Sequence, residues 1–153
     1  MTTPSIDDLK RGADDVSVGI ILYKTVNGRP LFLLMKHNKG GHWGAPKGHI
    51  ETGETPLDCA FRETREECGV TLESVDADFF EFIDYPVIKD GREITKRSGY
   101  FLARIPSDIR ERLSDEHNAL VWLPVDSAMK KVHENFAAVL KKANERITNV
   151  KNS

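Results

Sequence analysis

Three glutamates are spaced so that one face of a helix would carry all three carboxylates. Glu63, Glu66 and Glu67 stand at positions i, i+3 and i+4, which share one side of an α-helix. Carboxylates this close repel one another, and each raises the pKa of its neighbours. A bound divalent cation would remove the conflict, and hard oxygen ligands suit Mg²⁺ or Mn²⁺. The alternative is a solvated acidic face whose ion-pair partners are Arg62 and Arg65.

The residues upstream of these glutamates decide between the two interpretations. Gly48 is followed five residues later by Gly53 and Glu54, and Arg62 stands eight residues after Glu54. Residues 48–70 resemble the Nudix box, GX5EX7REUXEEXGU, in which U is an aliphatic residue. Every fixed position matches, and the single departure is Thr64, which stands where an aliphatic residue is expected. The resemblance implies an α/β (α+β) Nudix fold, in which helices sandwich a mixed β-sheet.

The resemblance also implies roles for the residues of the box. The metal ligands would be Glu63, Glu66 and Glu67, with the Gly48 carbonyl as a further ligand. Glu63 would in addition orient or deprotonate the attacking water.

Three further residues are expected to assist catalysis or bind the metal. Arg62 and Glu54 would hold the loop on the helix and aim the carboxylates. Glu116, on an expected loop, would be a fourth metal carboxylate or the general base, and its alternative role is that of a solvated loop acid.

The segments that flank the box resemble those of asymmetrical diadenosine tetraphosphate hydrolases. The resemblance lies in residues 42–54 (HWGAPKGHIETGE), in the pattern of residues 113–123, and in Tyr85, Lys96 and Tyr100. It implies hydrolysis of diadenosine tetraphosphate to ATP and AMP, with a dinucleoside polyphosphate or another nucleotide as substrate.

A long polyphosphate and an adenine ring each need particular side chains. The candidates for binding phosphate are His42, Lys47 and Lys96. The candidates for stacking on adenine are Tyr85 and Tyr100, because base–aromatic stacking is worth about 1–3 kcal/mol. For each tyrosine, the alternative is packing in the sheet with the hydroxyl at the rim.

Three other functions remain open. An RNA 5′-pyrophosphohydrolase would share the box and bind RNA phosphates through basic residues of the C-terminal tail; these are Lys130, Lys131, Lys141, Lys142, Arg146 and Lys151. The alternative for these residues is the solvated face of an amphipathic helix. A hydrolase of nucleoside diphosphate sugars would also share the box. A non-catalytic nucleotide sensor is disfavoured, because every carboxylate of the box is present.

The rest of the chain must position this helix and loop. Residues 1–15 are expected to be a flexible lead-in, and residues 16–150 a single domain. The residue pattern predicts strands at 16–24, 30–35, 79–85, 98–105 and 119–123, a glycine-rich loop at 37–54, helices at 55–69 and 126–147, and a short helical turn at 107–113.

Composition restricts the class of protein. The 153 residues carry a net charge of −2, which disfavours a nucleic-acid footprint over the whole surface and leaves only a local patch open. No apolar run is long enough to span a bilayer, so no membrane contact is expected. Cys59 and Cys68, on one expected helix, would lie roughly 13 Å apart and cannot pair, which favours a reducing, cytoplasmic setting. The oligomeric state is left open.

Overall fold

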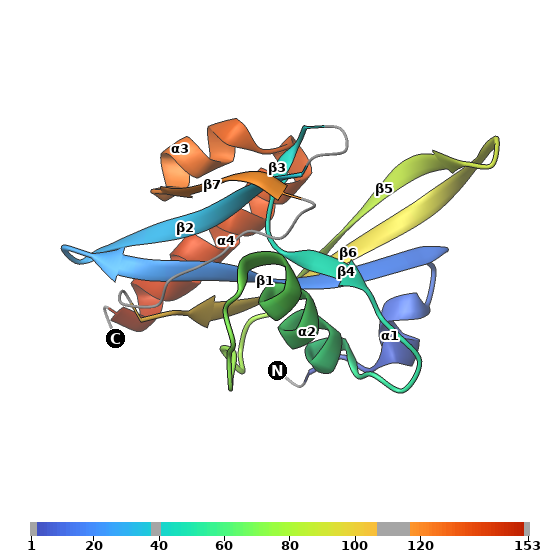
Figure 1. Ribbon diagram of the computed structural model, residues 1–153, viewed down its shortest axis with the longest axis horizontal. Coiled ribbons are helices and arrows are strands. Elements are labelled where there is room, and N and C mark those ends of the chain that lie inside the picture. Colours follow the sequence, from blue (N-terminus) through green and yellow to red (C-terminus); the bar gives the residue numbers. More distant parts are fainter. Residues whose placement is uncertain (1–2, 38–40, 107–116, 152–153) are drawn as a thin grey trace.

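A mixed β-sheet lies between helices in the computed structural model, which describes residues 3–37, 41–106 and 117–151 (Figure 1). The elements follow in the order α1 (Ile6–Lys10), β1 (Asp15–Val26), β2 (Arg29–His37), β3 (Trp43–Gly44), β4 (Lys47–His49), α2 (Pro56–Cys68), β5 (Glu81–Lys89), β6 (Arg92–Arg104), β7 (His117–Leu123), α3 (Val125–Lys131) and α4 (Glu134–Lys151). The predicted fold class is therefore confirmed. No helix of the described residues is long and apolar enough to cross a membrane.

Strand β1 is the centre of the sheet. It pairs in parallel with β6 and antiparallel with both β2 and β4. Because side chains alternate along a strand, Val18, Ile20 and Leu22 belong to the core cluster that includes α2. Ile21 belongs to the other cluster, which includes α3 and α4. Helices thus cover both faces, as expected of a continuously apolar strand.

Helix α2 begins and ends where its sequence predicts. The Thr55 hydroxyl accepts a hydrogen bond from the Asp58 N–H, and the Asp58 carboxylate accepts one from the Thr55 N–H, which together form a capping box. Pro56 occupies the first turn, and Gly69 closes the helix at φ +70°. The buried face of α2 includes Cys59 and other small residues. Glu63 and Glu67 of the same helix line the cleft.

Strands β5 and β6 form a long hairpin on the edge of the sheet (Figure 1). Along β5, alternate residues are exposed and half-buried. Ile83, Tyr85 and Val87 share the inner side, whereas Phe82 and Ile88 are exposed. The inner side of the hairpin therefore forms a wall for a site in the middle of the molecule.

Three features differ from the sequence prediction. The expected flexible lead-in contains helix α1, where Ser5 accepts a hydrogen bond from the Asp8 N–H and Leu9 is buried in the core. The glycine-rich loop contains the short strands β3 and β4, which pair with β2 and β1.

The third difference concerns the last helix, which is two helices. Val132 takes an extended conformation, at φ −108° and ψ 169°. The Asn135 N–H then donates to His133 Nδ1 at 3.2 Å, and α4 starts from there. The helical turn predicted at 107–113 lies outside the described residues, as does Glu116.

Candidate active site

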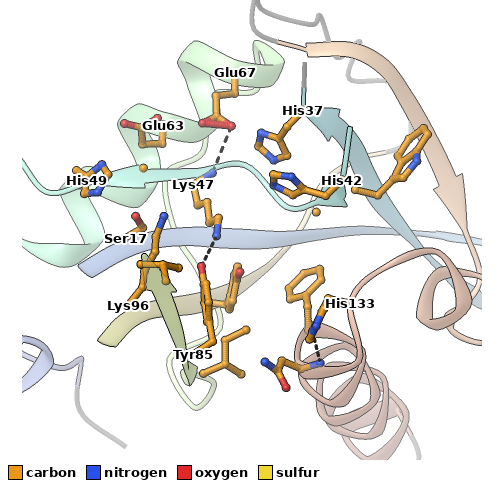
Figure 2. Close-up of a pocket in the computed structure, with 18 of the residues that line it drawn as sticks. Ser17, His37, His42, Lys47, His49, Glu63, Glu67, Tyr85, Lys96 and His133 are labelled. Atoms are coloured by element: carbon orange, nitrogen blue, oxygen red, sulfur yellow. Dashed lines mark hydrogen bonds between the residues drawn. The ribbon is translucent and has the colours of Figure 1, made fainter. Parts of the chain in front are cut away.

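A cleft of about 1050 Å³ lies between strand β4, helix α2, the β5–β6 hairpin and the start of α4 (Figure 2). It brings together most of the residues singled out in the sequence, namely His42, Lys47, Gly48, Glu63, Glu67, Tyr85, Lys96 and Tyr100. Figure 2 shows the glutamates entering from α2 on one side and the tyrosine from β5 on the other. Glu63 and Glu67 therefore share one space with the candidate substrate-binding groups, whereas Glu54, Arg62 and Glu66 are not among the residues that line it.

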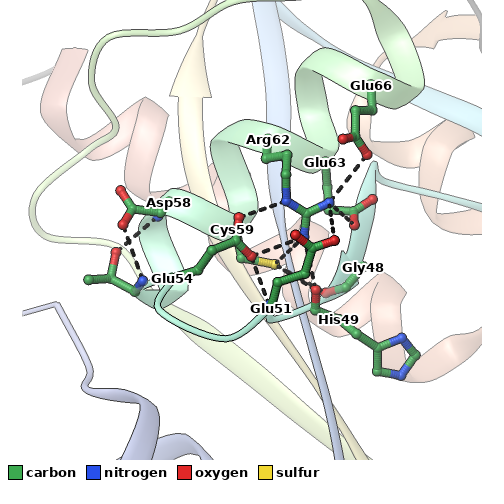
Figure 3. Close-up of polar contacts among 10 residues, drawn as sticks. Gly48, His49, Glu51, Glu54, Asp58, Cys59, Arg62, Glu63 and Glu66 are labelled. Carbon is green, nitrogen blue, oxygen red and sulfur yellow. Dashed lines mark hydrogen bonds and ion pairs between the residues drawn. The ribbon is translucent and has the colours of Figure 1, made fainter.

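Arg62 holds the loop of the box against α2 (Figure 3). Its Nε and Nη2 atoms donate to the two Glu54 oxygens at 2.6 and 3.0 Å, and Nη2 also donates to the His49 carbonyl at 3.0 Å. The same side chain reaches the helix, where Nη1 lies 2.9 Å from Glu63 Oε1 and 3.2 Å from Glu66 Oε2. The hydrogen bond to Glu54 raises the pKa of Arg62, and the same bond lowers the pKa of Glu54.

Gly48 lies directly against one of the expected metal ligands. A Cβ atom built at this position would overlap the Glu63 carboxylate. The backbone of β4 can therefore lie against α2 only because residue 48 has no side chain. This places a backbone segment and a hard carboxylate together at the cleft.

The other two glutamates of the face have different surroundings. Glu67 is 6% exposed, and its Oε2 accepts a hydrogen bond from the Lys47 backbone N–H at 3.3 Å. The Glu66 side chain is half exposed and pairs with Arg62. Among the described residues, no group of three His, Cys, Asp or Glu side chains converges as a metal cluster. The donors still fit a hard divalent cation, since Glu63 and Glu67 bring carboxylate oxygens to the cleft beside Gly48.

Lys47 and Tyr85, which line the cleft, form a triangle of polar atoms with the buried Ser98 hydroxyl. Lys47 Nζ lies 3.1 Å from Ser98 Oγ and 3.5 Å from the Tyr85 hydroxyl, and the two hydroxyl oxygens lie 3.1 Å apart. Burial lowers the pKa of Lys47. Burial by itself would raise the pKa of Tyr85, but the Lys47 charge and the Ser98 hydrogen bond lower it below its usual value.

His42 enters the cleft from beside β3. Its ring stacks on that of His37, with centroids 4.6 Å apart and planes at 17°. Burial lowers the pKa of His42, and the charges of Lys47 and Lys96 lower it further. A neutral imidazole near pH 7 can donate one hydrogen bond to a phosphate oxygen.

The two tyrosines have different surroundings. Tyr85 is half-buried and lines the cleft, as an adenine-stacking group would. Tyr100 is 3% exposed, and its ring packs on Phe136 with centroids 4.7 Å apart. Burial accordingly raises the pKa of Tyr100. These contacts favour the alternative interpretation for Tyr100, that of packing in the sheet.

Several residues of the cleft were missed by the sequence analysis. They include His37, His49, His133 and Phe136. Ser98, which is buried behind the cleft lining, was also missed as a hydrogen-bond partner of Lys47. The His49 side chain makes a hydrogen bond to Asp15, with Nε2 2.8 Å from a carboxylate oxygen. One signal was available for Ser98, because residues 96, 98 and 100 alternate along one side of a strand.

The fold and this cleft define a class of enzyme, the Nudix hydrolases. The NUDIX domain model matches residues 14–143, and the chain belongs to this family.

Its relatives include asymmetrical bis(5′-nucleosyl)-tetraphosphatases. The protein of that name from Caenorhabditis elegans is 31% identical over 117 residues, which cover 74% of this chain and 82% of the relative. That from Sus scrofa is 34% identical over 119 residues, covering 74% and 78%. A crystal structure of a C. elegans Ap4A hydrolase binary complex superposes with a TM-score of 0.81 at 28% identity, covering 88% of this chain and 98% of the other.

Proposed function

We propose that this Nudix hydrolase cleaves diadenosine tetraphosphate to ATP and AMP with the help of Mg²⁺ or Mn²⁺. The observation that carries the proposal is the composition of the cleft. The cationic or hydrogen-bonding side chains of His42, Lys47 and Lys96, together with the ring of Tyr85, line the same space as Glu63. A long polyphosphate needs such groups beyond the site of cleavage. The relatives named asymmetrical bis(5′-nucleosyl)-tetraphosphatase support the same substrate class.

The glutamate face of α2 is the proposed metal site. Nudix hydrolases generally use divalent metals. Glu63, Glu66, Glu67 and the Gly48 carbonyl would hold the ion. Bound there, a divalent cation would neutralise the pyrophosphate, lower the pKa of water and stabilise the charge that develops on the leaving oxygen.

The other residues of the chain orient the substrate and the carboxylates. Glu63 orients the attacking water or accepts its proton. Arg62 aims that carboxylate, because its guanidinium is already fixed on Glu54 at 2.6 and 3.0 Å. Lys47, next to the box glycine, neutralises phosphate charge near the bond that breaks. Tyr85 offers its ring to the adenine.

A panel of three substrates tests the proposal. Diadenosine tetraphosphate, a 5′-triphosphorylated RNA and a nucleoside diphosphate sugar are each incubated with the protein and Mg²⁺, and products are separated by ion-exchange chromatography. We expect the highest kcat/KM on diadenosine tetraphosphate, with ATP and AMP in equal amounts. Glu63→Gln is the control for contaminating hydrolases. A higher kcat/KM on RNA or on the sugar, or two ADP from the tetraphosphate, would contradict the proposal.

The basic residues of the last helix give less support to the RNA alternative. Lys142 Nζ lies 3.3 Å from a Glu81 oxygen. The Arg146 guanidinium makes two hydrogen bonds with Asp76, at 2.9 and 3.1 Å. These two cations are thus paired with carboxylates of the preceding segments, which reduces the positive charge that α4 offers to RNA phosphates.

A further inference from the structure

Ser98 is a fully buried hydroxyl at the point where three elements of the cleft meet. It lies on β6, paired with Ser17 of β1 on one side and Ile83 of β5 on the other, and none of its surface is exposed. A buried hydroxyl is costly unless it makes hydrogen bonds. Ser98 makes them to Lys47 and Tyr85, which the proposed function assigns to substrate binding.

The two partners come from separate strands. Lys47 begins β4, which pairs with β1, whereas Tyr85 lies in β5 at the edge of the sheet. The direct contact between them is long, at 3.5 Å from Nζ to the hydroxyl, whereas each lies 3.1 Å from Ser98 Oγ. A lysine ammonium can only donate. The Ser98 oxygen can therefore accept from Lys47 while its own hydrogen points to Tyr85.

Lys47 would otherwise have considerable freedom. A lysine side chain is a flexible four-carbon stem that ends in a compact charge, and ordering it costs rotamer entropy. In this protein its ammonium has two hydroxyl acceptors in the cleft, and the Lys47 backbone N–H is held by Glu67. The ammonium is thus placed in advance of any substrate.

We propose that Ser98 is a positioning residue, which fixes the Lys47 ammonium and the Tyr85 ring relative to each other so that one binds the phosphate chain and the other the base. The inference rests on the proposed function, since it assigns Lys47 and Tyr85 to the substrate. Ser98 itself need not touch the substrate. Its contribution is to reduce the loss of freedom on binding, which affects the Michaelis complex and the transition state alike.

Ser98→Ala tests this role. It removes the shared hydroxyl with little change in volume. We expect KM for diadenosine tetraphosphate to rise about five- to tenfold, the scale of one or two hydrogen bonds, with kcat within about threefold of the wild-type value. Thr95→Ala is the matched control, because it removes a hydroxyl from the same strand on the opposite side. It should leave KM unchanged. An unchanged KM for Ser98→Ala would overturn the proposal.

A double-mutant cycle separates positioning from a general structural role. Tyr85→Phe removes the hydroxyl that Ser98 contacts and keeps the ring. If Ser98 acts through Tyr85 and Lys47, Ser98→Ala should raise KM less in the Tyr85→Phe background than in the wild type. Effects that simply multiply would show that Ser98 acts independently of Tyr85, which contradicts the proposed role.

Different experiments test the proposed function and the role of Ser98, so one can fail without the other. A wild-type protein that hydrolyses none of the three panel substrates contradicts the function. The Ser98 role is then decided by calorimetric titration with ATP, which offers both a base and a phosphate chain. A Kd raised about five- to tenfold in Ser98→Ala supports the role, and equal Kd values overturn it.

Discussion

The backbone of Gly48 lies so close to the Glu63 carboxylate that the space a Cβ atom would need is already occupied. This contact joins strand β4 to helix α2 at the proposed metal site. It gives the first glycine of the box a steric reason, because any side chain at residue 48 would overlap that carboxylate. The same contact makes Gly48 a sensitive position for mutation.

Gly48→Ala should therefore displace Glu63 or separate β4 from α2. We expect kcat/KM to fall by at least about 10²-fold, since a misplacement of about 1 Å can cost that much. The free energy of unfolding should also fall, by about 1–3 kcal/mol, as in other overpacked sites. Removing the carboxylate with Glu63→Ala in the same chain should restore stability but not activity. Normal kcat/KM in folded Gly48→Ala would contradict the role given to this contact.

Glu67→Gln tests the proposed metal site by removing one charge. The substitution keeps an oxygen that can accept the Lys47 N–H, so the fold should be retained. We expect kcat at saturating Mg²⁺ to fall by at least about 10²-fold, because charge stabilisation by the bound ion is weakened. Stability without metal should hold or rise, since a like-charged neighbour is gone. Glu73→Gln, at an exposed position after α2, is the control. Near-normal turnover in Glu67→Gln would refute the assignment.

Thr64 is the residue that departs from the aliphatic pattern of the box. It is completely buried, and no hydrogen bond to its hydroxyl is found among the described residues. Thr64→Val replaces the hydroxyl by a methyl group of nearly the same shape. We expect stability to rise by about 1 kcal/mol, and Tm by about 2–4 °C in a thermal melt, with activity unchanged. Thr64→Ala should instead lower Tm by leaving a cavity. A lower Tm for Thr64→Val would show that the hydroxyl is satisfied.

The sequence predicted the parts of the fold that depend on local signals. Helix α2 was found because Thr55, Pro56 and Gly69 mark its ends. The strands predicted at 16–24 and 30–35 correspond to β1 and β2, and Asn27 and Gly28 between them adopt the positive φ of a hairpin turn. The break between α3 and α4 was missed, since apolar spacing continues across it and only two residues, the extended Val132 and His133, separate the helices. Helix α1 was missed because its five residues are too few and too polar to show a helical spacing of apolar side chains. The helix is held in place instead by a side chain that is distant in the sequence.

The sequence indicated which residues gather at the candidate site only as far as the motif extends. The box identified the residues around Arg62, whose contacts are local in sequence. It could not show that Ser98 would meet Lys47, 51 residues away in the chain, because that contact depends on the pairing of β1 with both β4 and β6. Nor could it separate Tyr85 from Tyr100, whose difference in exposure is set by the packing of Phe136.

The distant side chain that holds helix α1 is Arg97. Its Nη1 donates to the Leu9 and Arg11 carbonyls at 2.8 Å each. Its Nε and Nη2 donate to the two Asp84 oxygens at 2.7 and 2.9 Å. The bond to Arg97 lowers the pKa of Asp84 below its usual range.

The pH dependence of stability follows from this shift. The folded pKa of Asp84 is lower than the unfolded one, so the unfolded state takes up the proton first as the pH falls. The Asp84–Arg97 pair therefore stabilises the fold at pH values above about 4, the pKa of an aspartate in the unfolded chain. This stabilisation is lost as the pH falls through the lower pKa of Asp84 in the folded protein. We expect Asp84→Asn to lower the free energy of unfolding at pH 7 by about 1–2 kcal/mol. The free energy of unfolding, measured by urea titration, should also decrease less steeply below about pH 5 in this variant than in the wild type.

Asp90→Asn, at the tip of the same hairpin, is the control for Asp84→Asn. Asp90 makes no ion pair with any described residue, and asparagine tolerates its positive φ. It should leave both the stability at pH 7 and the acid slope unchanged. An identical slope in the wild type and Asp84→Asn would contradict the proposed origin of the acid sensitivity.

Lys96 distinguishes a long polyphosphate from a shorter substrate. It lies on β6 opposite Tyr85 of β5 and lines the cleft. Lys96→Met keeps most of the apolar stem and removes the charge. With diadenosine tetraphosphate we expect a loss of roughly 1–3 kcal/mol in kcat/KM, the scale of a charge-assisted hydrogen bond. With a nucleoside diphosphate sugar the loss should be small, because that substrate has only two phosphates.

The test is the difference between the losses of kcat/KM on the two substrates, and Lys89→Met is the control variant. Lys89 is exposed at the end of β5, so its removal changes the net charge equally without changing the cleft. It should alter kcat/KM on either substrate by less than about twofold at physiological salt, where distant surface charges are screened. Equal losses on both substrates for Lys96→Met would mean that Lys96 is structural or binds the diphosphate that the substrates share. The charge of the cleft would then no longer favour a tetraphosphate over a nucleoside diphosphate sugar.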